Sequence, residues 1–211
     1  MVQTKLTETV YVFCISLLKL VYLNLLWFLF TLFGLGIFGI FPATAALCRI
    51  QQQWLIEKNN SSPIFLFYWR EYKRNFLRVN MLAVTLFLIG FILYFDLKFF
   101  VHKGGMINQI ISLGIYILSI WYMIVLLYIL PTYTAYRLKL YKYIQYAFII
   151  GMLNPLKTLG LAIAAGGMMY LSLYFPQILF SLGVSVTFFI IMNVGGQAIH
   201  QVTVLKGKFS Y

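Results

Sequence analysis

Five stretches of the chain are apolar over about 20 residues each, and this feature limits the possible folds more than any other. They cover roughly residues 20–41, 79–97, 107–130, 157–174 and 176–197. A helix needs about 20 mostly apolar residues to cross the hydrocarbon core of a bilayer. The sequence therefore predicts an all-α membrane protein, with residues 1–211 forming a single polytopic domain of about five transmembrane helices.

The composition supports this class and bounds the partners of the chain. Hydrophobic residues make up 63% of the 211 residues and charged residues only 9%, whereas a soluble domain carries about 25% charged residues. The 16 Lys and Arg residues outnumber the 4 Asp and Glu residues. A basic balance also fits nucleic-acid binding, but so apolar a chain has little free surface for a duplex. We therefore expect the lipid bilayer, and no nucleic acid, as a partner.

The distribution of positive charge predicts the orientation. Residues 1–19 are expected to form an interfacial N-terminal segment, with Lys19 at the outer membrane boundary. With five spans, residues 42–78, residues 131–157 and the tail 198–211 share one side, and they hold 12 of the 16 Lys and Arg residues. Since cytoplasmic loops are enriched in Lys and Arg, the N-terminus is predicted outside and the C-terminus in the cytoplasm.

The region between the first two spans carries the most distinctive polar residues. Pro42 is predicted to end the first span and bend the chain, because proline does not continue a helix. An aromatic and basic segment from residue 65 has helical spacing, which predicts an amphipathic helix along the membrane surface. Because Tyr, Trp and Arg dominate protein interfaces, this segment is also a candidate docking element. Its candidate residues are Phe65, Tyr68, Trp69, Tyr72, Lys73, Arg74, Asn75 and Phe76.

The second predicted cytoplasmic region repeats this plan. Pro131 is expected to end the third span, and Asn154 followed by Pro155 restarts a helix. The segments NFLRVNMLA at 75–83 and NPLKTLGLA at 154–162 share four of nine positions. The sequence thus allows a parallel internal repeat followed by a fifth helix, with chance similarity between membrane helices as the alternative.

The residues that usually carry chemistry are sparse. None of the four carboxylates lies within a few helical positions of a histidine, and the two cysteines lack metal-ligand spacing. Since membrane enzymes need convergent ionisable groups, we expect no catalytic residues, no cofactor and no metal. The alternative function is a stand-alone transporter or channel for a small solute, with a mostly neutral path lined by Asn24, Asn193 and Gln197.

Three segments resemble a known family. Asn24-Leu-Leu-Trp27, GIFGIFPATAAL at 36–47 and YWREYKRNF at 68–76 resemble the patterns of the YesL-like family of small bacterial membrane proteins. The resemblance covers essentially the whole chain in length and in order of spans. The candidate bend and packing motif that it marks comprises Asn24, Trp27, Gly39, Pro42, Ala43 and Thr44.

The function of this family is unknown, but its members are often encoded beside carbohydrate-uptake ABC transporters, commonly in Gram-positive bacteria. The resemblance therefore implies a multi-pass protein of the bacterial plasma membrane. It also implies a non-catalytic accessory role in a carbohydrate (oligosaccharide) ABC importer, with the permease subunits as partners. It implies no catalytic residues, because none are established for the family.

Overall fold

The structure is a computed structural model that describes residues 2–56, 63–103 and 105–208. Within these ranges all regular structure is helical, which confirms the predicted all-α class. The elements are α1 (Val2–Phe33), α2 (Ile37–Ile56), α3 (Ile64–His102), α4 (Met106–Ala135), α5 (Leu140–Leu153), α6 (Pro155–Tyr174), α7 (Pro176–Ile178), the π-helical turn η1 (Leu179–Gly183) and α8 (Val184–Lys208).

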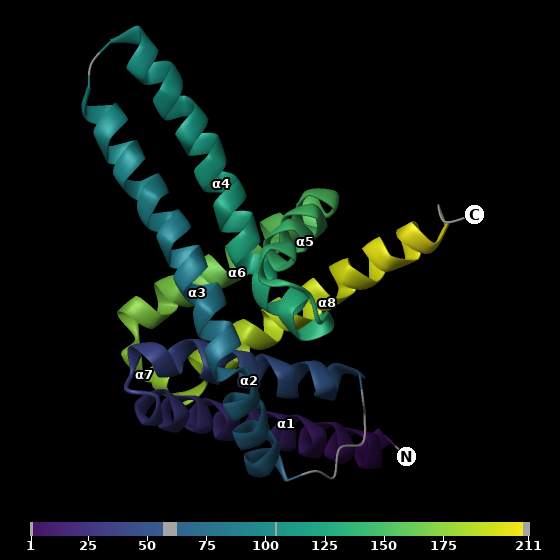
Figure 1. Cartoon of the computed structure of the whole chain (residues 1–211). Helices are drawn as coiled ribbons and strands as arrows, with labels where there is room; N and C mark the ends of the chain where they lie inside the picture. Colours follow the sequence, from purple (N-terminus) through teal and green to yellow (C-terminus); the bar gives the residue numbers. More distant parts are fainter. Residues whose placement is uncertain (1, 57–62, 104, 209–211) are drawn as a thin grey trace.

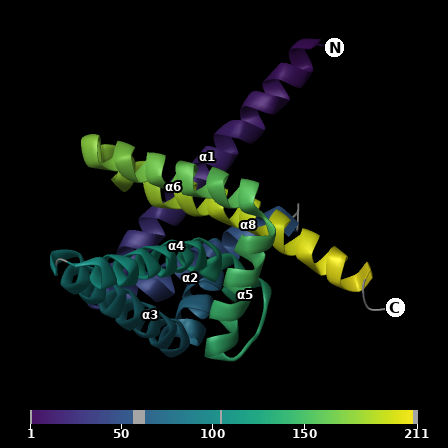
Figure 2. The same cartoon turned by 90° about the horizontal axis from the view of Figure 1, so that it is seen from above.

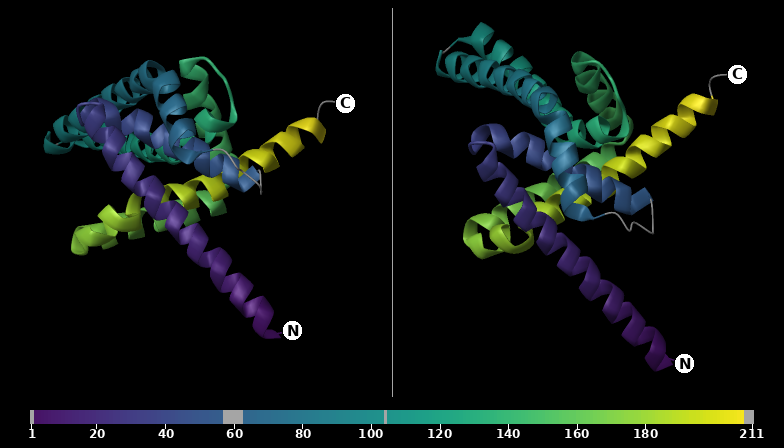
Figure 3. Two further views of the ribbon diagram at one scale, coloured as in Figure 1. Left: turned by 90° about the horizontal axis from the view of Figure 1, so that it is seen from below. Right: turned by 60° about the horizontal axis from the view of Figure 1, so that its bottom comes forward.

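The helices are arranged around α2. This helix contacts α1, α3, α4 and α8, and it lies near the centre of the molecule (Figure 1). α3 and α4 pair along their length and project away from the other helices, whereas α6 packs against α8 (Figures 1 and 2). The N-terminal part of α1 and the C-terminal part of α8 extend away from this body (Figure 3).

Five helical segments are long and apolar enough to cross a membrane, as the sequence predicts. They are Phe13–Phe33, Ile64–His102, Met106–Ala135, Pro155–Tyr174 and Pro176–Val204. Much of their apolar surface is exposed, as it is for Ile163 and Leu173 on α6. Such surface is covered by lipid tails in a bilayer.

The first helix ends earlier than predicted, and Pro42 is not the cause. α1 stops at Phe33, and the chain reverses through Leu35 (φ 61°) and Gly36 (φ 73°) before α2 begins at Ile37. Left-handed backbone of this kind favours glycine. Gly39 lets the two helices approach closely beyond the turn, since a Cβ atom on it would lie 2.3 Å from the carbonyl oxygen of Thr31.

The prediction that Pro42 ends the first span and bends the chain is wrong, because Pro42 lies buried inside α2. A proline inside a helix leaves the carbonyl four residues earlier without its N–H donor. Here that carbonyl belongs to Phe38, and the Asn80 side chain on α3 donates a hydrogen bond to it at 3.1 Å. A side chain that is distant in sequence thus makes the interior proline tolerable.

Pro131 also lies inside a helix, since α4 continues to Ala135. The helix break comes before Pro42 in the first predicted unit and after Pro131 in the second. The two units of the predicted repeat therefore differ at their prolines. The restart at Pro155 is confirmed, because α6 begins at that residue.

The aromatic and basic segment 65–76 does not form a separate helix on the membrane surface. It is the first part of α3, which continues without a break for 39 residues. At 1.5 Å per residue this helix is about 58 Å long, roughly twice the hydrocarbon thickness of a bilayer. α3 therefore has enough length to cross a membrane and to extend beyond it.

Two apolar clusters lie on either side of α2. Ala45 belongs to a cluster with α4, α5 and α8 that includes Tyr128 and Ala147. Leu47 belongs to the other cluster, in which α1 contributes Phe30 and α3 contributes Tyr68. Both clusters depend on α2 keeping its position.

Lys19 contradicts part of the predicted topology. Its ammonium group lies 5.7 Å from the ring centroid of Trp54, because α1 and α2 run antiparallel. The sequence predicts Lys19 at the outer boundary and Trp54 in a cytoplasmic loop. Two residues in contact lie at the same depth, so these two placements cannot both hold.

This contact predicts that residues 19 and 54 are reached from the same side of the membrane. Single cysteines at these positions, in a chain carrying Cys14→Ser and Cys48→Ala, should both react with an impermeant maleimide from one face of sealed vesicles. Lys103→Cys, at the far end of α3, should react only from the other face. Labelling of positions 19 and 54 from opposite faces would contradict the arrangement of α1 and α2.

The close approach at Gly39 predicts a steric effect of its replacement. Gly39→Ala should lower the free energy of unfolding by about 1–3 kcal/mol, because the added methyl group meets backbone that cannot move freely. Gly160→Ala on α6 is the matched control, since nothing lies within 4 Å of its added Cβ atom. Thermal unfolding in detergent checks both, and equal stability of the two variants would count against the α1–α2 contact.

Candidate functional site

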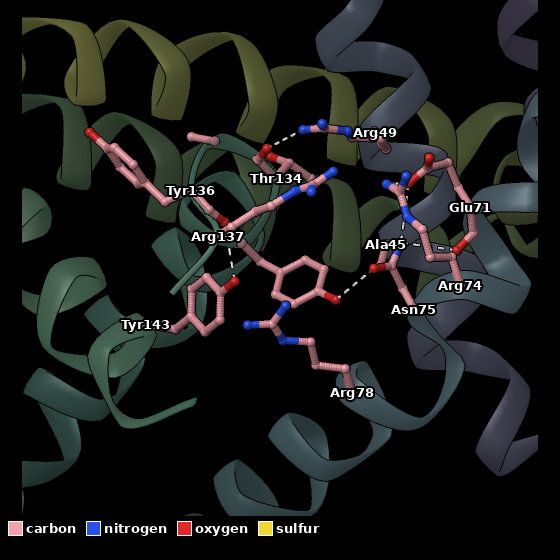
Figure 4. Close-up of a pocket in the computed structure, with 12 residues that line it drawn as sticks. Ala45, Arg49, Glu71, Arg74, Asn75, Arg78, Thr134, Tyr136, Arg137 and Tyr143 are labelled. Carbon is pink, nitrogen blue, oxygen red and sulfur yellow. Dashed lines mark hydrogen bonds and ion pairs between the residues drawn. The ribbon is translucent and has the colours of Figure 1, made fainter. Parts of the chain in front are cut away.

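The main polar site of the chain is a recess where α2, α3 and the end of α4 meet. It is a cavity of about 300 Å³, which α2 lines with Arg49, α3 with Arg74 and Arg78, and the segment after α4 with Arg137. Figure 4 shows these four guanidinium groups around one shared space. A second cavity of about 410 Å³ adjoins it, shares Arg49 and Arg74, and adds Arg70. We call the two cavities together the arginine recess.

The arginine recess gathers all the arginines of the protein. The sequence contains five arginines and eleven lysines. Each arginine lines at least one of the two cavities, whereas no lysine of the described residues lines either. Arginine and lysine carry the same charge, so this separation is not explained by charge alone.

Glu71 is the only carboxylate that lines the recess among the described residues. Its side chain is 3% exposed and accepts a hydrogen bond from Arg74 at 2.6 Å. Asn75 donates to the same oxygen at 3.1 Å and accepts a hydrogen bond from the Tyr133 hydroxyl at 3.0 Å. This network joins α3 to α4, and it leaves the recess with one negative charge against five positive charges.

Two further arginines bind backbone carbonyls at and beyond the end of α4. Arg49 donates to the carbonyl of Thr134 and, at 3.0 Å, to the Gln52 side chain. Arg78 donates to the carbonyl of Leu138. The last carbonyls of a helix lack partners within it and carry partial negative charge. Arg49 therefore satisfies an acceptor that α4 leaves open, and Arg78 binds the segment just beyond it, so the two cations fix α2 and α3 against this end of α4.

The segment between α4 and α5 is held in place by Tyr143. Its hydroxyl donates to the carbonyl of Tyr136 at 3.1 Å and accepts from the N–H of Leu138 at 3.0 Å. Arg137 lies between these two residues, is exposed, and makes no hydrogen bond or ion pair with any described residue. The segment thus presents Arg137 to the recess from a fixed backbone.

The candidate docking residues divide between the core, the recess and the surface. Tyr68 and Tyr72 are buried, with their rings 4.8 and 5.1 Å from Phe30. Arg74 and Asn75 line the recess. Lys73 and Phe65 are exposed, whereas Trp69 and Phe76 are half-buried. The predicted aromatic face is therefore used largely to bind α3 to α1 and α2.

The bend and packing motif joins helices inside the protein. Trp27 donates from its indole N–H to the Thr44 hydroxyl at 2.9 Å, which connects α1 to α2. Ala43 is fully buried, and its carbonyl accepts a hydrogen bond from the Tyr68 hydroxyl at 2.7 Å. Asn24 is also fully buried and donates to the carbonyl of Phe180 at 2.6 Å. These residues stabilise the fold rather than present a binding surface.

The residues of the predicted transport path do not share a site. Asn24 is buried against the start of α8, where its side chain accepts a hydrogen bond from the N–H of Ser185 at 3.2 Å. Asn193 and Gln197 are exposed farther along α8 and bond to each other at 3.2 Å. None of the three lines either cavity of the arginine recess.

The cysteines and acidic residues offer little chemistry in the described part of the chain. Among those residues no group of three or more His, Cys, Asp or Glu side chains is placed to hold a metal ion. Cys48 is buried, and this burial raises the pKa of its thiol, which makes the reactive thiolate scarce. Glu57, one of the four carboxylates of the sequence, lies outside the described residues.

From the sequence, the arginines predict orientation and Arg74 is a candidate docking residue, but the five arginines are not predicted to form one site. A signal was present, because all five arginines fall within residues 49–78 and at position 137, whereas the lysines are spread along the chain. Both regions were predicted to face the same side of the membrane. Only the helix packing shows that they meet.

The Tyr133–Asn75 bond predicts a measurable contribution to stability. Tyr133→Phe should lower the free energy of unfolding by about 1 kcal/mol, because it leaves the Asn75 carbonyl oxygen without its donor. Tyr141→Phe, on the exposed side of α5, removes the same hydroxyl where no described residue bonds to it and should change little. Denaturant titration in mixed micelles compares them, and equal effects would contradict the network.

Comparison with known proteins places the chain in a family. The family model described as "Protein of unknown function, DUF624" matches residues 20–97. The uncharacterized protein YesV of Bacillus subtilis (strain 168) is 32% identical over 177 residues, covering 84% of this chain and 85% of YesV. The uncharacterized protein YteU of the same strain is 33% identical over 166 residues, covering 79% of this chain and 74% of YteU.

A further relative is the uncharacterized protein YesL of the same strain, which is 28% identical over 163 residues, covering 77% of this chain and 76% of YesL. No solved structure matches the chain. The two relatives above 30% identity extend over most of both chains. The chain therefore belongs to the YesL-like DUF624 family of proteins of unknown function.

Proposed function

We propose that this chain is a non-catalytic membrane protein that assists a carbohydrate ABC importer. The hydrogen bonds of Glu71 are the observation that supports a non-catalytic role. This residue is the only carboxylate of the recess in the described chain, and Arg74 and Asn75 already occupy it. A recess of arginines without a free base favours binding over acid–base catalysis. The importer comes from the family resemblance described above.

The exposed residues at the start of α3 are the proposed contact with the permease subunits. Lys73 lies 4.0 Å from the ring centroid of Trp69, and Phe65 is 44% exposed nearby. An apolar groove of about 330 Å³ runs beside them, lined by Trp69, Phe76 and the α1–α2 turn. Exposed aromatic and cationic residues next to an apolar groove suit a protein partner.

We further propose that the protein lies in the bacterial plasma membrane, with the recess and the C-terminus facing the cytoplasm. Residues 42–78 and 131–157, which carry most of the positive charge, both contribute to the recess. The positive-inside rule supports their cytoplasmic placement. Because Lys19 contacts Trp54, residue 19 is placed on that side too, and its predicted outer position is not retained.

Purification from native membranes tests this function. The tagged protein, extracted in mild detergent, should bring permease subunits with it in stoichiometric amounts, identified by mass spectrometry. Lys73→Glu should lower their yield about tenfold, because it replaces an attractive charge with a repulsive one. Lys142→Glu is the matched control, since it makes the same change on the exposed side of α5.

Oligosaccharide uptake by cells carrying the same variants provides the second readout. Uptake should fall with Lys73→Glu and stay near the wild-type rate with Lys142→Glu. A chain that purifies alone, or only with itself, would refute the accessory role. Equal loss of permease subunits with both variants would refute the proposed contact.

A further inference from the structure

We propose that the arginine recess is a binding site for a phosphate group, carried by a phospholipid headgroup or by a soluble phosphorylated compound. This site does not depend on the importer being the partner. Five guanidinium groups from three parts of the chain line two adjoining cavities. A guanidinium group presents its N–H donors in a planar fork that fits phosphate oxygens, which an ammonium group does not.

The N–H donors of two of these arginines are not bonded to any described residue. Arg70 packs 5.2 Å from the ring centroid of Phe67, and Arg137 is exposed at the recess. Neither makes a hydrogen bond or ion pair with any described residue. Arg49 and Arg78 are fixed by backbone carbonyls, and Arg74 by Glu71. The site thus combines three arginines whose side chains are fixed by hydrogen bonds with two arginines that are open to a ligand.

The charge of the recess calls for a multivalent anion. The first cavity has four arginines and one carboxylate, which leaves a formal charge of +3 among its lining residues. Grouped charges of one sign repel one another unless a counter-charge lies among them. A phosphate monoester carries about −1.5 to −2 at neutral pH and offers three acceptor oxygens, so it compensates more of this charge than one carboxylate.

The size of the recess indicates a ligand larger than phosphate itself. The cavities of about 300 and 410 Å³ reach the range of small-molecule sites. The lining of the second cavity also includes the Gln52 side chain and the apolar side chains of Ile56 and Phe67. These polar and apolar groups suit the organic part of a phosphorylated ligand.

The recess lies beside Thr134, at the end of a helix that is long enough to cross the membrane. The ends of such helices lie near the phosphates of the lipid headgroups, and basic pockets there bind anionic lipids. The same recess is also open enough for a soluble phosphate compound. Both sources share the chemistry that the arginines recognise.

The test uses the purified full chain in neutral detergent after removal of bound lipid. One arm titrates inorganic phosphate by calorimetry, against chloride at equal ionic strength. The other arm reconstitutes the protein in vesicles of phosphatidylcholine and phosphatidic acid, whose headgroup is a phosphate monoester, and native mass spectrometry then identifies retained lipid. Arg137→Gln is the test variant, and Lys139→Gln makes the same charge change two residues away, outside the recess.

We expect Arg137→Gln to weaken binding about tenfold, the usual loss for one charge-assisted hydrogen bond, and Lys139→Gln to weaken it less than about twofold. If this difference between the variants is seen with inorganic phosphate, the recess binds a soluble phosphate compound. If it is seen with lipid, the recess binds the phosphate of a lipid headgroup. Because Arg137 bonds to no described residue, its variant should keep the wild-type melting temperature. Absence of binding in both arms, or equal weakening by the two variants, would overturn the proposal.

Discussion

α2 carries the half-buried Arg49 and the fully buried Gln51 into a molecule whose other helices are mostly apolar, and neighbouring helices supply acceptors for the N–H donors of both side chains. Arg49 bonds to the carbonyl of Thr134 on α4, and Gln51 donates to the carbonyl of Ser185 on α8 at 2.7 Å. Burying a polar group away from water without a hydrogen bond costs several kcal/mol of free energy. The bond from Arg49 holds α2 against the end of α4, and Arg78 of α3 binds the carbonyl of Leu138 just beyond that end, so the arginine recess forms where α2 and α3 meet α4.

The recess explains a separation that charge counting does not. A positively charged cytoplasmic face needs only lysine or arginine, yet this chain places every arginine at one site and its lysines elsewhere. Some of these arginines hold the fold by binding carbonyls, and others remain open. The same site thus holds helices together and is open to an anion. An anion that binds there would stabilise this arrangement of the helices.

Much of the fold could be predicted from the sequence, because membrane helices leave a strong local signal. The class and the five apolar helices follow from composition and length alone. The position of the first break could not be predicted in this way, since Pro42 lies inside α2 and the carbonyl that it leaves open, that of Phe38, is bonded by Asn80 of α3, which is distant in sequence. The convergence of Arg49, Arg78 and Arg137 could not be predicted either, since it depends on how helices pack rather than on any local pattern.

The central claim is that all five arginines share one partly enclosed site, and arginine-selective NMR tests it most directly. With only the arginine side chains labelled with ¹⁵N, the Nη–H groups of the protein in detergent report on these bonds. We expect dispersed, slowly exchanging Nη signals for Arg49, Arg74 and Arg78, whose Nη atoms donate hydrogen bonds, and signals near free arginine for Arg70 and Arg137. Signals that all coincide with free arginine would contradict the claim, because they would place every guanidinium group in water.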